Sequence, residues 1–546
     1  MDLVLVGLPG GGKTAAARRL ARRHGAEPID LDEVIAAAAG RPIPAIFDEE
    51  GEAGFRARER AAVAALGPPD VAPGLGRVIS TGGGAPIDPR NRWLLYRGRH
   101  VAWLDAPAEV LAQRIRHSPN PRPLLAGRDP IGTMRGLAAS RARFYAPALR
   151  VNGIIGLTGV VETLERHVDD PITDGTTLLR AQTEIGRYEL GEGNAVAGVL
   201  AALAALDARR AILVTEPRAW EVAGAALADG LAAAGIPVDR LVLPEGEAAK
   251  RMAVVERAAS ELARLRAERG DPLVAIGGGA LGDAAGFLAA TWLRGVPIIH
   301  VPTTLVAQID SAIGGKTAVD LPEGKNLVGA FHQPAAVVVD VRFLRSLPSR
   351  QLRAALGEAV KMAALGDERL FELLEAEGRA IAAGEARVHE NGALAEVVER
   401  CGWAKIEVVT ADEREQGGRI NLNLGHSLAH AIEAAAGYEG VLHGEAVAYG
   451  LRSACRIGVA VEATPPDRAA RIEALLDALD LGRAPLPYPL DRVLAAIVTD
   501  KKHAGGRLRW VLPTAAGVTV RSDVPDEAVE AAALGVLAGA GAGVRA

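Results

Sequence analysis

Lysine is rare in this chain of 546 residues, because only eight of its 62 basic residues are lysine and the rest are arginine. Lysine carries a compact ammonium on a thin stem, whereas arginine carries a wide planar fork. A narrow phosphate pocket can admit the first and exclude the second. Chance survival would scatter the lysines, yet nearly all stand beside glycines, carboxylates or histidines, so we expect them to mark polar sites: Lys13, Lys250, Lys316, Lys325, Lys361, Lys405, Lys501 and Lys502.

Cysteine and long apolar runs are also scarce. Two cysteines cannot form a disulfide framework, so a reducing cytosol is the expected location. No uncharged apolar stretch reaches the roughly 18 residues of a membrane helix, and Met1 leads directly into Leu3–Gly7 without a signal peptide. With a net charge of −5 as well, we expect neither a membrane nor a nucleic-acid partner.

The chain is long enough for three to four domains. Short apolar strands alternate with helical patterns twice, which predicts two parallel α/β regions joined by the polar segment Asp169–Thr177. From about Pro348 to Leu534 the pattern is helical almost throughout, and Gly535–Ala546 reads as a flexible tail. The expected strands are Leu3–Val6, Val78–Ser80, Val101–Leu104, Ala211–Thr215, Leu241–Leu243, Leu273–Ile276, Ile298–Val301 and Val337–Asp340.

The first region opens with a nucleotide-binding motif. Gly7–Thr14 reads GLPGGGKT and satisfies G-x-x-x-x-G-K-[ST], after a strand and before the helical pattern Ala15–Arg23. Its glycines let backbone N–H groups surround phosphates at a helix N-terminus. Lys13 would reach the β- and γ-phosphates of a nucleotide, and the Thr14 hydroxyl would hold Mg²⁺.

Further polar groups follow other strands of this region. Asp30 and Asp32 lie one residue apart, on one side of an extended chain, and could divide metal and substrate-hydroxyl duties. A helix N-cap is the alternative use of such an aspartate. Ser80–Gly84 (STGGG) allows close approach of backbone to a ligand, although a plain turn would use the same glycines. Three arginines stand in separate polar contexts, where each alone is more often surface than site: Arg56, Arg122 and Arg141.

Residues 1 to about 165 resemble the shikimate kinases. The motifs GLPGGGKT, DLD, GFR, TGGG, RPLL and SRARFY occur in that family's order. The resemblance implies a P-loop kinase domain that phosphorylates the 3-hydroxyl of shikimate with ATP and Mg²⁺. Asp32, Arg56, Gly83 and Arg141 would bind shikimate, and Asp32 would orient or deprotonate the attacking hydroxyl. The implied nucleotide-binding residues are Gly10, Gly11, Gly12, Lys13, Thr14 and Ala15, with Arg122 in a lid.

The second region contains a weaker cofactor signal. Gly277–Asp283 (GGGALGD) follows a strand and precedes a helix, which suits a pyrophosphate but is common in other turns. Polar groups also follow neighbouring strands at Glu245–Lys250 and Thr303–Thr304. Two Gly-Lys pairs, at Gly315 and Gly324, lack the frame of a P-loop, and we reject that interpretation for them.

The segment Asn421–Glu445 holds three of the eleven histidines. His426 and His430 are spaced i, i+4 on one helix face, so spacing alone favours this pair as zinc ligands. His443 follows after a loop, and Glu358 offers a carboxylate from an earlier helix. Histidines that cap and pack between helices are the alternative.

Residues 178 to about 535 resemble the 3-dehydroquinate synthases, on the motifs GGGALGD, PTT, IDSAIGGKTAVD, GKN, GEAVK, GRINLNLGHSLAH and LHGEAVA. The resemblance implies a Rossmann-like α/β NAD domain followed by an all-helical metal-binding domain. It gives Zn²⁺ or Co²⁺ to Glu358, His426 and His443, and makes His430 an active-site group instead. Glu245 replaces a more usual Asp, and Ser427–Ala429 replaces a more usual TFG-like triplet, both mild departures.

The resemblance also assigns substrate and cofactor residues. Around the substrate it places Asp310, Lys316, Asn326, Lys361, Lys405, Arg419, Asn423 and His430, with one phosphate contact from Lys501 or Lys502. Among these, Lys316, Lys361, Lys405, Arg419 and His430 would be catalytic. Around NAD it places Glu245, Gly246, Glu247, Ala248, Ala249, Lys250, Gly279, Ala280, Leu281, Gly282, Asp283, Thr303, Thr304, Lys316, Lys325, Phe343, Leu344, Arg345 and Ser346.

The two resemblances together imply one chain with two non-consecutive activities of chorismate biosynthesis. The second half would convert 3-deoxy-arabino-heptulosonate 7-phosphate to 3-dehydroquinate and phosphate, with NAD regenerated in each turnover, and would form a homodimer. Another sugar-phosphate cyclase, a metal-dependent polyol dehydrogenase and a non-catalytic scaffold are the alternatives. The expected divisions are a kinase domain 1–166, a linker 167–177, an NAD domain 178–347, a helical domain 348–535 and a tail 536–546.

Overall fold

The computed structural model describes residues 1–70, 74–116, 129–145, 148–168, 176–182, 187–193, 195–415, 417–503 and 508–539. Arg122 and most of the expected linker, residues 169–175, lie outside these ranges. The chain divides into two compact units, Met1–Gln182 and Thr183–Ala546. Within the described ranges, none of the helices combines the length and the apolar character needed to cross a bilayer.

The first unit is built on a parallel five-stranded sheet with the strand order β2-β3-β1-β4-β5. Alternate residues of β1 point to opposite faces, as the pleat requires. Leu3 and Leu5 pack in one core, and Val4 and Val6 pack in another. The strands are β1 (Asp2–Val6), β2 (Glu27–Asp30), β3 (Arg77–Ser80), β4 (His100–Asp105) and β5 (Leu149–Asn152).

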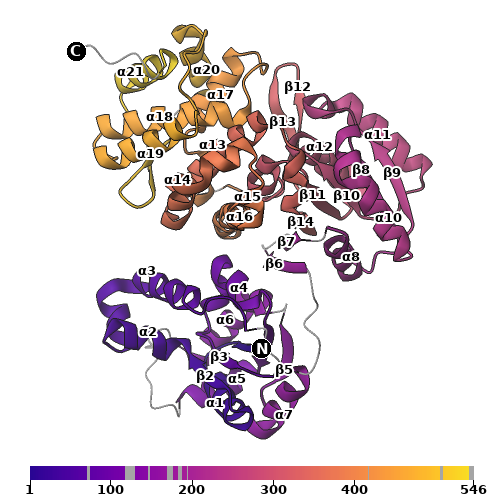
Figure 1. Ribbon diagram of the computed structural model, residues 1–546, viewed down its shortest axis with the longest axis vertical. Helices are drawn as coiled ribbons and strands as arrows, with labels where there is room; N and C mark the ends of the chain where they lie inside the picture. The colour runs from indigo at the N-terminus through magenta and orange to yellow at the C-terminus, as the bar shows by residue number, and fades with distance from the viewer. Residues whose placement is uncertain are drawn as a thin grey trace. The chain divides into compact units, whose positions relative to one another are not determined.

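Helices cover both faces of this sheet (Figure 1). Side chains of α1 and α7 fill the first core, and side chains of α2, α3, α5 and α6 contribute to the second. The parallel α/β layout expected for this region is confirmed. The helices are α1 (Lys13–His24), α2 (Leu31–Ala39), α3 (Ile43–Ala64), α4 (Pro89–Tyr96), α5 (Ala108–Arg116), α6 (Pro130–Tyr145) and α7 (Gly156–Val168), and strand β6 (Thr176–Gln182) ends the unit.

The second unit contains a parallel sheet in which the strands follow the order β7-β14-β11-β10-β8-β9. Its two cores hold α8 and α10 on one face and α11 and α12 on the other (Figure 1). The strands are β7 (Arg187–Gly193), β8 (Ala211–Thr215), β9 (Val238–Val242), β10 (Leu273–Gly277), β11 (Ile298–Pro302) and β14 (Ala336–Val339). The helices are α8 (Ala195–Ala205), α10 (Ala225–Ala233), α11 (Met252–Arg264) and α12 (Gly279–Thr291).

The rest of the second unit is mainly helical, as expected. Its helices are α13 (Ser349–Ala364), α14 (Glu368–Ala383), α15 (Arg387–Glu390), α16 (Ala393–Ala411), α17 (His426–Ala435), α18 (His443–Ala460), α19 (Pro466–Ala478), α20 (Leu490–His503) and α21 (Asp526–Leu537). Two antiparallel hairpins were not predicted: β12 (Lys316–Leu321) with β13 (Gly324–Phe331), and β15 (Trp510–Pro513) with β16 (Val518–Arg521). Lys316, Gly324 and Lys325 lie in the first hairpin and Gly315 directly precedes it, so neither Gly-Lys pair has the strand–loop–helix frame of a P-loop.

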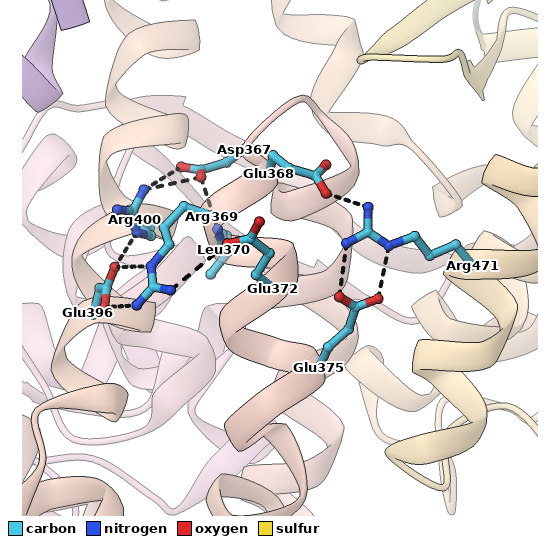
Figure 2. A network of polar contacts seen from close by, with 9 residues as sticks. All are labelled: Asp367, Glu368, Arg369, Leu370, Glu372, Glu375, Glu396, Arg400 and Arg471. Atoms are coloured by element: carbon cyan, nitrogen blue, oxygen red, sulfur yellow. Dashed lines mark hydrogen bonds and ion pairs between the residues drawn. The ribbon is translucent and has the colours of Figure 1, made fainter. Parts of the chain in front are cut away.

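An ion-pair network on the surface joins α14 to the neighbouring helices α16 and α19 (Figure 2). Arg471 of α19 donates two hydrogen bonds to Glu375, each 2.9 Å long, and also binds Glu368. Arg369 of α14 pairs with Glu396 of α16 at 3.1 Å. Bidentate arginine–carboxylate pairs fix geometry more firmly than single contacts do. The network therefore ties together α14, α16 and α19, which pack against α13 or α18.

Candidate active sites

The P-loop candidate lies directly between β1 and α1. Gly7, Gly10 and Gly12 have φ angles of 132°, 80° and 85°, which residues with a Cβ rarely adopt. Lys13 Nζ donates hydrogen bonds to the carbonyl oxygens of Gly7 and Leu8, at 2.8 and 3.0 Å. The sequence thus forms a glycine-rich loop at a helix N-terminus with its lysine folded over the loop, and this arrangement suits phosphate binding.

A second group of oxygens lies beside this loop. The Thr14 hydroxyl donates to Asp30 Oδ2 at 2.6 Å and lies 3.2 Å from Ser80 Oγ. Asp30 caps α2, since its Oδ1 accepts from the backbone N–H of Asp32 at 3.0 Å. The expectation of an extended chain across Asp30 and Asp32 was wrong, because α2 begins at Leu31 and Asp32 lies in its first turn. Hydroxyl and carboxylate oxygens are ligands that Mg²⁺ accepts.

The predicted shikimate residues border the glycine turn after β3. A Cβ placed on Gly82 would lie 3.1 Å from Asp32 Oδ1, and one placed on Gly84 would lie 2.5 Å from Arg56 Nη1. Arg141 is buried, at 7% exposure. Tyr145 donates from Oη to the Gly83 carbonyl, and burial raises the pKa of Tyr145 to about 12 although Arg141 opposes this shift.

Two residues of this unit were missed by the sequence reasoning. Glu59 is 1% exposed and accepts from Arg56 Nη1 at 2.7 Å, and burial raises its pKa against the effect of Arg56. Its position three residues after Arg56 on α3 was the available signal. Arg114 of α5 donates to the carbonyl oxygens of Gly10 and Gly153, at 3.5 and 2.9 Å, and so links the P-loop to the turn after β5.

In the second unit a cavity of about 470 Å³ lies where several parallel strands end. Ligands bind at that edge in open α/β sheets. The predicted NAD residues that line it are Glu245, Gly246, Gly279, Ala280, Leu281, Thr303, Thr304 and Ser346. Those that do not are Glu247, Ala248, Ala249, Lys250, Gly282, Asp283, Lys316, Lys325, Phe343, Leu344 and Arg345.

Glu216 and Arg218, which the sequence reasoning missed, also line this cavity. Glu216 Oε2 accepts from the Gly246 backbone N–H at 3.1 Å, and Glu245 Oε1 accepts from the Arg218 backbone N–H at 3.2 Å. These bonds connect the segments that follow β8 and β9. The position of Glu216 directly after a buried strand was the signal that would have found it.

A polar cluster centred on Lys250 gathers residues from three segments. Lys250 Nζ donates to Asp283 Oδ2 at 2.7 Å and also to Asn326 Oδ1. The Asn326 backbone N–H in turn donates to Asp320 at 2.8 Å. Burial raises the pKa of Asp283, although Lys250 opposes the shift. The predicted NAD and substrate residues Lys250, Asp283 and Asn326 therefore lie together.

Three helices bring a carboxylate and two imidazoles together. Within the described ranges, Glu358, His426 and His443 form the group of potential metal ligands whose donor atoms all lie within 4.8 Å of one another. Glu358 Oε1 lies 3.5 Å from His426 Nε2 and 3.1 Å from His443 Nε2. One carboxylate and two imidazoles match a catalytic zinc site with an open position. His430 is outside the group and exposed, with its ring centroid 5.4 Å from that of His426.

The electrostatics of this group favour a cation. Glu358 is completely buried; burial raises its pKa, but Lys361 and the two imidazoles outweigh burial and hold the pKa well below its usual value. Burial lowers the pKa of His443, but Glu358 and Glu433 raise it to about 10. The two carboxylates at its nitrogens therefore favour positive charge at this position.

Glycines explain how the three helices come so close. Each candidate ligand adjoins a glycine: Gly357 precedes Glu358, Gly425 precedes His426 and Gly444 follows His443. A Cβ on Gly357 would overlap the Gly444 carbonyl, and a Cβ on Gly444 would overlap the Ala354 carbonyl. Gly425 meets Gly450 of α18 in the same way. The backbones of α13, α17 and α18 can therefore approach to contact beside the ligands.

Two lysines share one carboxylate next to this group. Asp310 Oδ1 lies 2.7 Å from Lys405 Nζ and 3.8 Å from Lys361 Nζ, and Lys361 Nζ lies 2.5 Å from Glu358 Oε2. Burial lowers the pKa of Lys405, and the nearby cations Lys361 and Arg419 lower it further. For Lys361 burial also lowers the pKa, but Glu358 and Asp310 outweigh it and raise the value.

The remaining predicted residues lie in neighbouring segments. Lys316 pairs with Glu415 at 2.6 Å, with its side chain 50% exposed. Arg419 is buried and donates to the Gly314 carbonyl at 2.9 Å. Asn423 ends the 3₁₀ helix η8 (Gly418–Asn423), two residues before Gly425. Lys501 and Lys502 lie in the last turn of α20.

Comparison with known proteins assigns both units to classes of enzyme. The family model for shikimate kinase matches residues 9–152. The models for the N-terminal and C-terminal parts of 3-dehydroquinate synthase match residues 240–354 and 355–503. The 3-dehydroquinate synthase of Symbiobacterium thermophilum is 44% identical over 356 residues, which cover 63% of this chain and 96% of that protein.

Solved structures of sugar-phosphate cyclases share the fold of the second part. One is ValA, the 2-epi-5-epi-valiolone synthase of Streptomyces hygroscopicus, with NAD⁺ and Zn²⁺ bound: TM-score 0.60 and 29% identity, covering 65% of this chain and 98% of that one. Another is 2-deoxy-scyllo-inosose synthase with carbaglucose-6-phosphate, NAD⁺ and Co²⁺: TM-score 0.56 and 25% identity, covering 66% and 100%. The chain belongs to the 3-dehydroquinate synthase family and carries a shikimate kinase domain ahead of the synthase.

Proposed function

We propose that this chain catalyses two non-consecutive steps of chorismate biosynthesis. One is the phosphorylation of shikimate to 3-phosphoshikimate with MgATP. The other converts 3-deoxy-D-arabino-heptulosonate 7-phosphate to 3-dehydroquinate and phosphate, with NAD and Zn²⁺ or Co²⁺ as cofactors. The observation that carries the proposal is the coexistence of a P-loop with Lys13 and a separate Glu358, His426 and His443 group beside a cavity at the strand ends.

In the kinase domain, Lys13 would bind the β- and γ-phosphates, and Thr14 with Asp30 would hold the magnesium. Bound Mg²⁺ neutralises phosphate charge. Arg56 and Arg141 bind the shikimate carboxylate, and Gly83 approaches it through the backbone. Asp32, which borders the same turn, orients or deprotonates the 3-hydroxyl. Arg122 lies outside the described residues, and the resemblance to shikimate kinases alone assigns it to ATP.

In the synthase, Glu358, His426 and His443 hold the metal, and the cavity that ends near His443 holds NAD. When bound, the metal polarises a substrate hydroxyl and NAD accepts and returns a hydride. Lys361 stays cationic between Glu358 and Asp310 and binds substrate oxygen. Lys405, whose pKa burial lowers, is the better candidate to move a proton, together with the exposed His430.

Substrate anions are bound by groups around this centre. Lys316, Arg419, Asn326 and Asn423 would contact the carboxylate and hydroxyls, and the resemblance assigns one phosphate contact to Lys501 or Lys502. The proposed divisions are a kinase domain at 1–166, an NAD domain at 178–347 and a helical domain at 348–535. A homodimer formed through the synthase, and a cytosolic location, stay predictions; the mass of the purified chain in solution tests the first.

Two substitutions test the proposal together. Lys13→Ala should abolish phosphorylation of shikimate and leave phosphate release from the heptulosonate phosphate unchanged, because the lysine serves only the P-loop. His443→Ala should do the opposite. Both activities are measured on the same preparations of the full chain, so each variant is the control for the other. Loss of both activities in either variant, or of neither, would contradict the assignment of two separate sites.

A further inference from the structure

Glu433 is a buried carboxylate that faces the candidate metal group but takes no part in it. It lies on α17 and is 7% exposed. Its Oε2 lies 3.3 Å from His443 Nδ1, and its Oε1 lies 4.0 Å from Lys325 Nζ. Burying an ionised carboxylate is costly unless it is paired. The contact between Glu433 and the His443 ring must therefore offset the free energy that burying this carboxylate costs.

The two candidate histidine ligands are oriented in different ways. His426 Nδ1 lies 3.1 Å from the backbone carbonyl of Leu424, so its ring is held by the main chain. His443 meets a carboxylate through each nitrogen, Glu433 at Nδ1 and Glu358 at Nε2. A neutral imidazole carries one N–H, and a carboxylate at Nδ1 keeps that proton there. The lone pair of Nε2 then points toward the metal position.

Neighbouring groups hold Glu433 in this place. The Tyr438 backbone N–H donates to the Glu433 carbonyl at 2.8 Å, which ends α17 against the loop that leads to His443. Lys325 lies over the Tyr438 ring at 5.2 Å and donates to Glu247 at 3.2 Å. The β12–β13 hairpin thus brings an ammonium near Glu433 without a direct hydrogen bond, so Glu433 keeps its charge and its Oε2 stays available to the ring.

We infer that Glu433 is a positioning residue for the metal: it accepts the Nδ1–H of His443, fixes the tautomer with Nε2 free, and thereby strengthens binding of a divalent cation by Glu358, His426 and His443. The inference rests on the proposed function, because it needs that metal site. Glu433 itself is not a member of the candidate ligand group.

The experiment compares two substitutions at Glu433 in the full chain. Glu433→Gln keeps a hydrogen-bond acceptor and loses the charge, whereas Glu433→Leu loses both. Glu439→Gln, on the exposed loop six residues further on, removes the same charge without touching His443. The dissociation constant for Zn²⁺ is measured on metal-stripped protein by competition with a chromogenic chelator, and thermal melting of the stripped protein is recorded alongside.

We expect Glu433→Leu to weaken zinc binding by about 10- to 100-fold, Glu433→Gln to weaken it by an intermediate factor, and Glu439→Gln to leave it unchanged. The metal-stripped variants should have the same melting temperature as the metal-stripped unsubstituted chain. If Glu433 served only to stabilise the fold, its substitution would lower that melting temperature. Zinc affinity of Glu433→Leu within about twofold of the unsubstituted chain would overturn the inference. If that variant does not fold, Glu433→Gln decides, and an affinity equal to that of the unsubstituted chain overturns it.

The same titration separates this inference from the proposed function. The unsubstituted chain should bind one zinc at this site, and His443→Ala should lose it. If the unsubstituted chain binds no zinc, or His443→Ala binds it equally well, the proposed metal site fails. If both behave as expected and the Glu433 variants bind normally, only the role of Glu433 fails.

Discussion

Lys13, Lys250, Lys361 and Lys405 are all buried, although lysine is usually a surface residue. Each donates to, or pairs with, groups at one of the candidate sites. A compact ammonium needs less room than a planar guanidinium, which suits lysine to these positions. The scarcity of lysine therefore predicted these four residues of the candidate sites. Lys316 differs from them, because half of its side chain is exposed.

His300 of β11 supplies a prediction on pH. It is 6% exposed, and burial together with His332 lowers its pKa from the ordinary 6.5 to about 4. The unfolded chain takes up this proton near pH 6.5, and the folded chain takes it up only near pH 4. The free energy of unfolding should therefore fall as the pH drops through this window, by about 3 kcal/mol in total.

The measurement is urea unfolding of the full chain between pH 7 and pH 5, compared with His300→Phe. The substituted chain cannot take up the proton, so its stability should depend less steeply on pH over this interval. If the free energy of unfolding changed with pH equally in the two proteins, His300 would not have the lowered pKa that its burial predicts.

Single residues also mark the limit of the sequence reasoning. Spacing favoured His426 with His430, because i, i+4 neighbours share a helix face. The group of donor atoms uses His443 in place of His430, and this ligand comes from the start of another helix. The distance between residues on two different helices depends on tertiary packing, which the spacing of residues in the sequence does not reveal. The resemblance to a family identified His443 instead. Glu433 was missed for the same reason.

At the scale of elements, glycines at helix contacts determine the candidate metal site. Gly357 on α13 and Gly444 on α18 lie backbone to backbone, and Gly425 before α17 meets Gly450 on α18. The candidate ligands Glu358, His426 and His443 adjoin Gly357, Gly425 and Gly444 in the chain. The spacing of donor atoms therefore depends on how closely three helix backbones approach, and not on the ligand side chains alone.

Gly444→Ala tests this dependence without changing a ligand. The new Cβ would overlap the Ala354 carbonyl, so α13 and α18 must separate, at a cost of about 1–3 kcal/mol or more. We expect a lower melting temperature and zinc affinity reduced by at least about tenfold, a loss comparable to that of a disturbed ligand shell. Gly270→Ala is the control, because a Cβ there meets nothing within 4 Å. Unchanged zinc affinity in Gly444→Ala would contradict this account.

Buried strands and strand–turn–helix units could be predicted, because a run such as residues 211–214 is apolar throughout and is soon followed by Pro217. The hairpins could not. The strand Val518–Arg521 has mixed burial and no continuous apolar run, and it is defined by pairing with Trp510–Pro513. Asp32 was misplaced because a strand and a helix meet at Asp30, and element boundaries depend on capping.

At the scale of the whole molecule, two compact units each have their own sheet and cores. The P-loop and its neighbouring oxygens belong to the first unit, and the cavity and the candidate metal ligands belong to the second. The two proposed reactions are not successive steps, so no intermediate needs to pass between the units. The kinase activity should depend on MgATP alone, and the synthase activity should depend on NAD and the divalent metal alone.

The central claim is that NAD in the second unit is regenerated within each turnover, as expected of a synthase and not of a dehydrogenase. The most direct measurement follows phosphate release and NADH absorbance together, on the purified chain with 3-deoxy-D-arabino-heptulosonate 7-phosphate, NAD and zinc. We predict stoichiometric release of phosphate without net NADH. NADH that accumulates in step with substrate consumption would contradict the account.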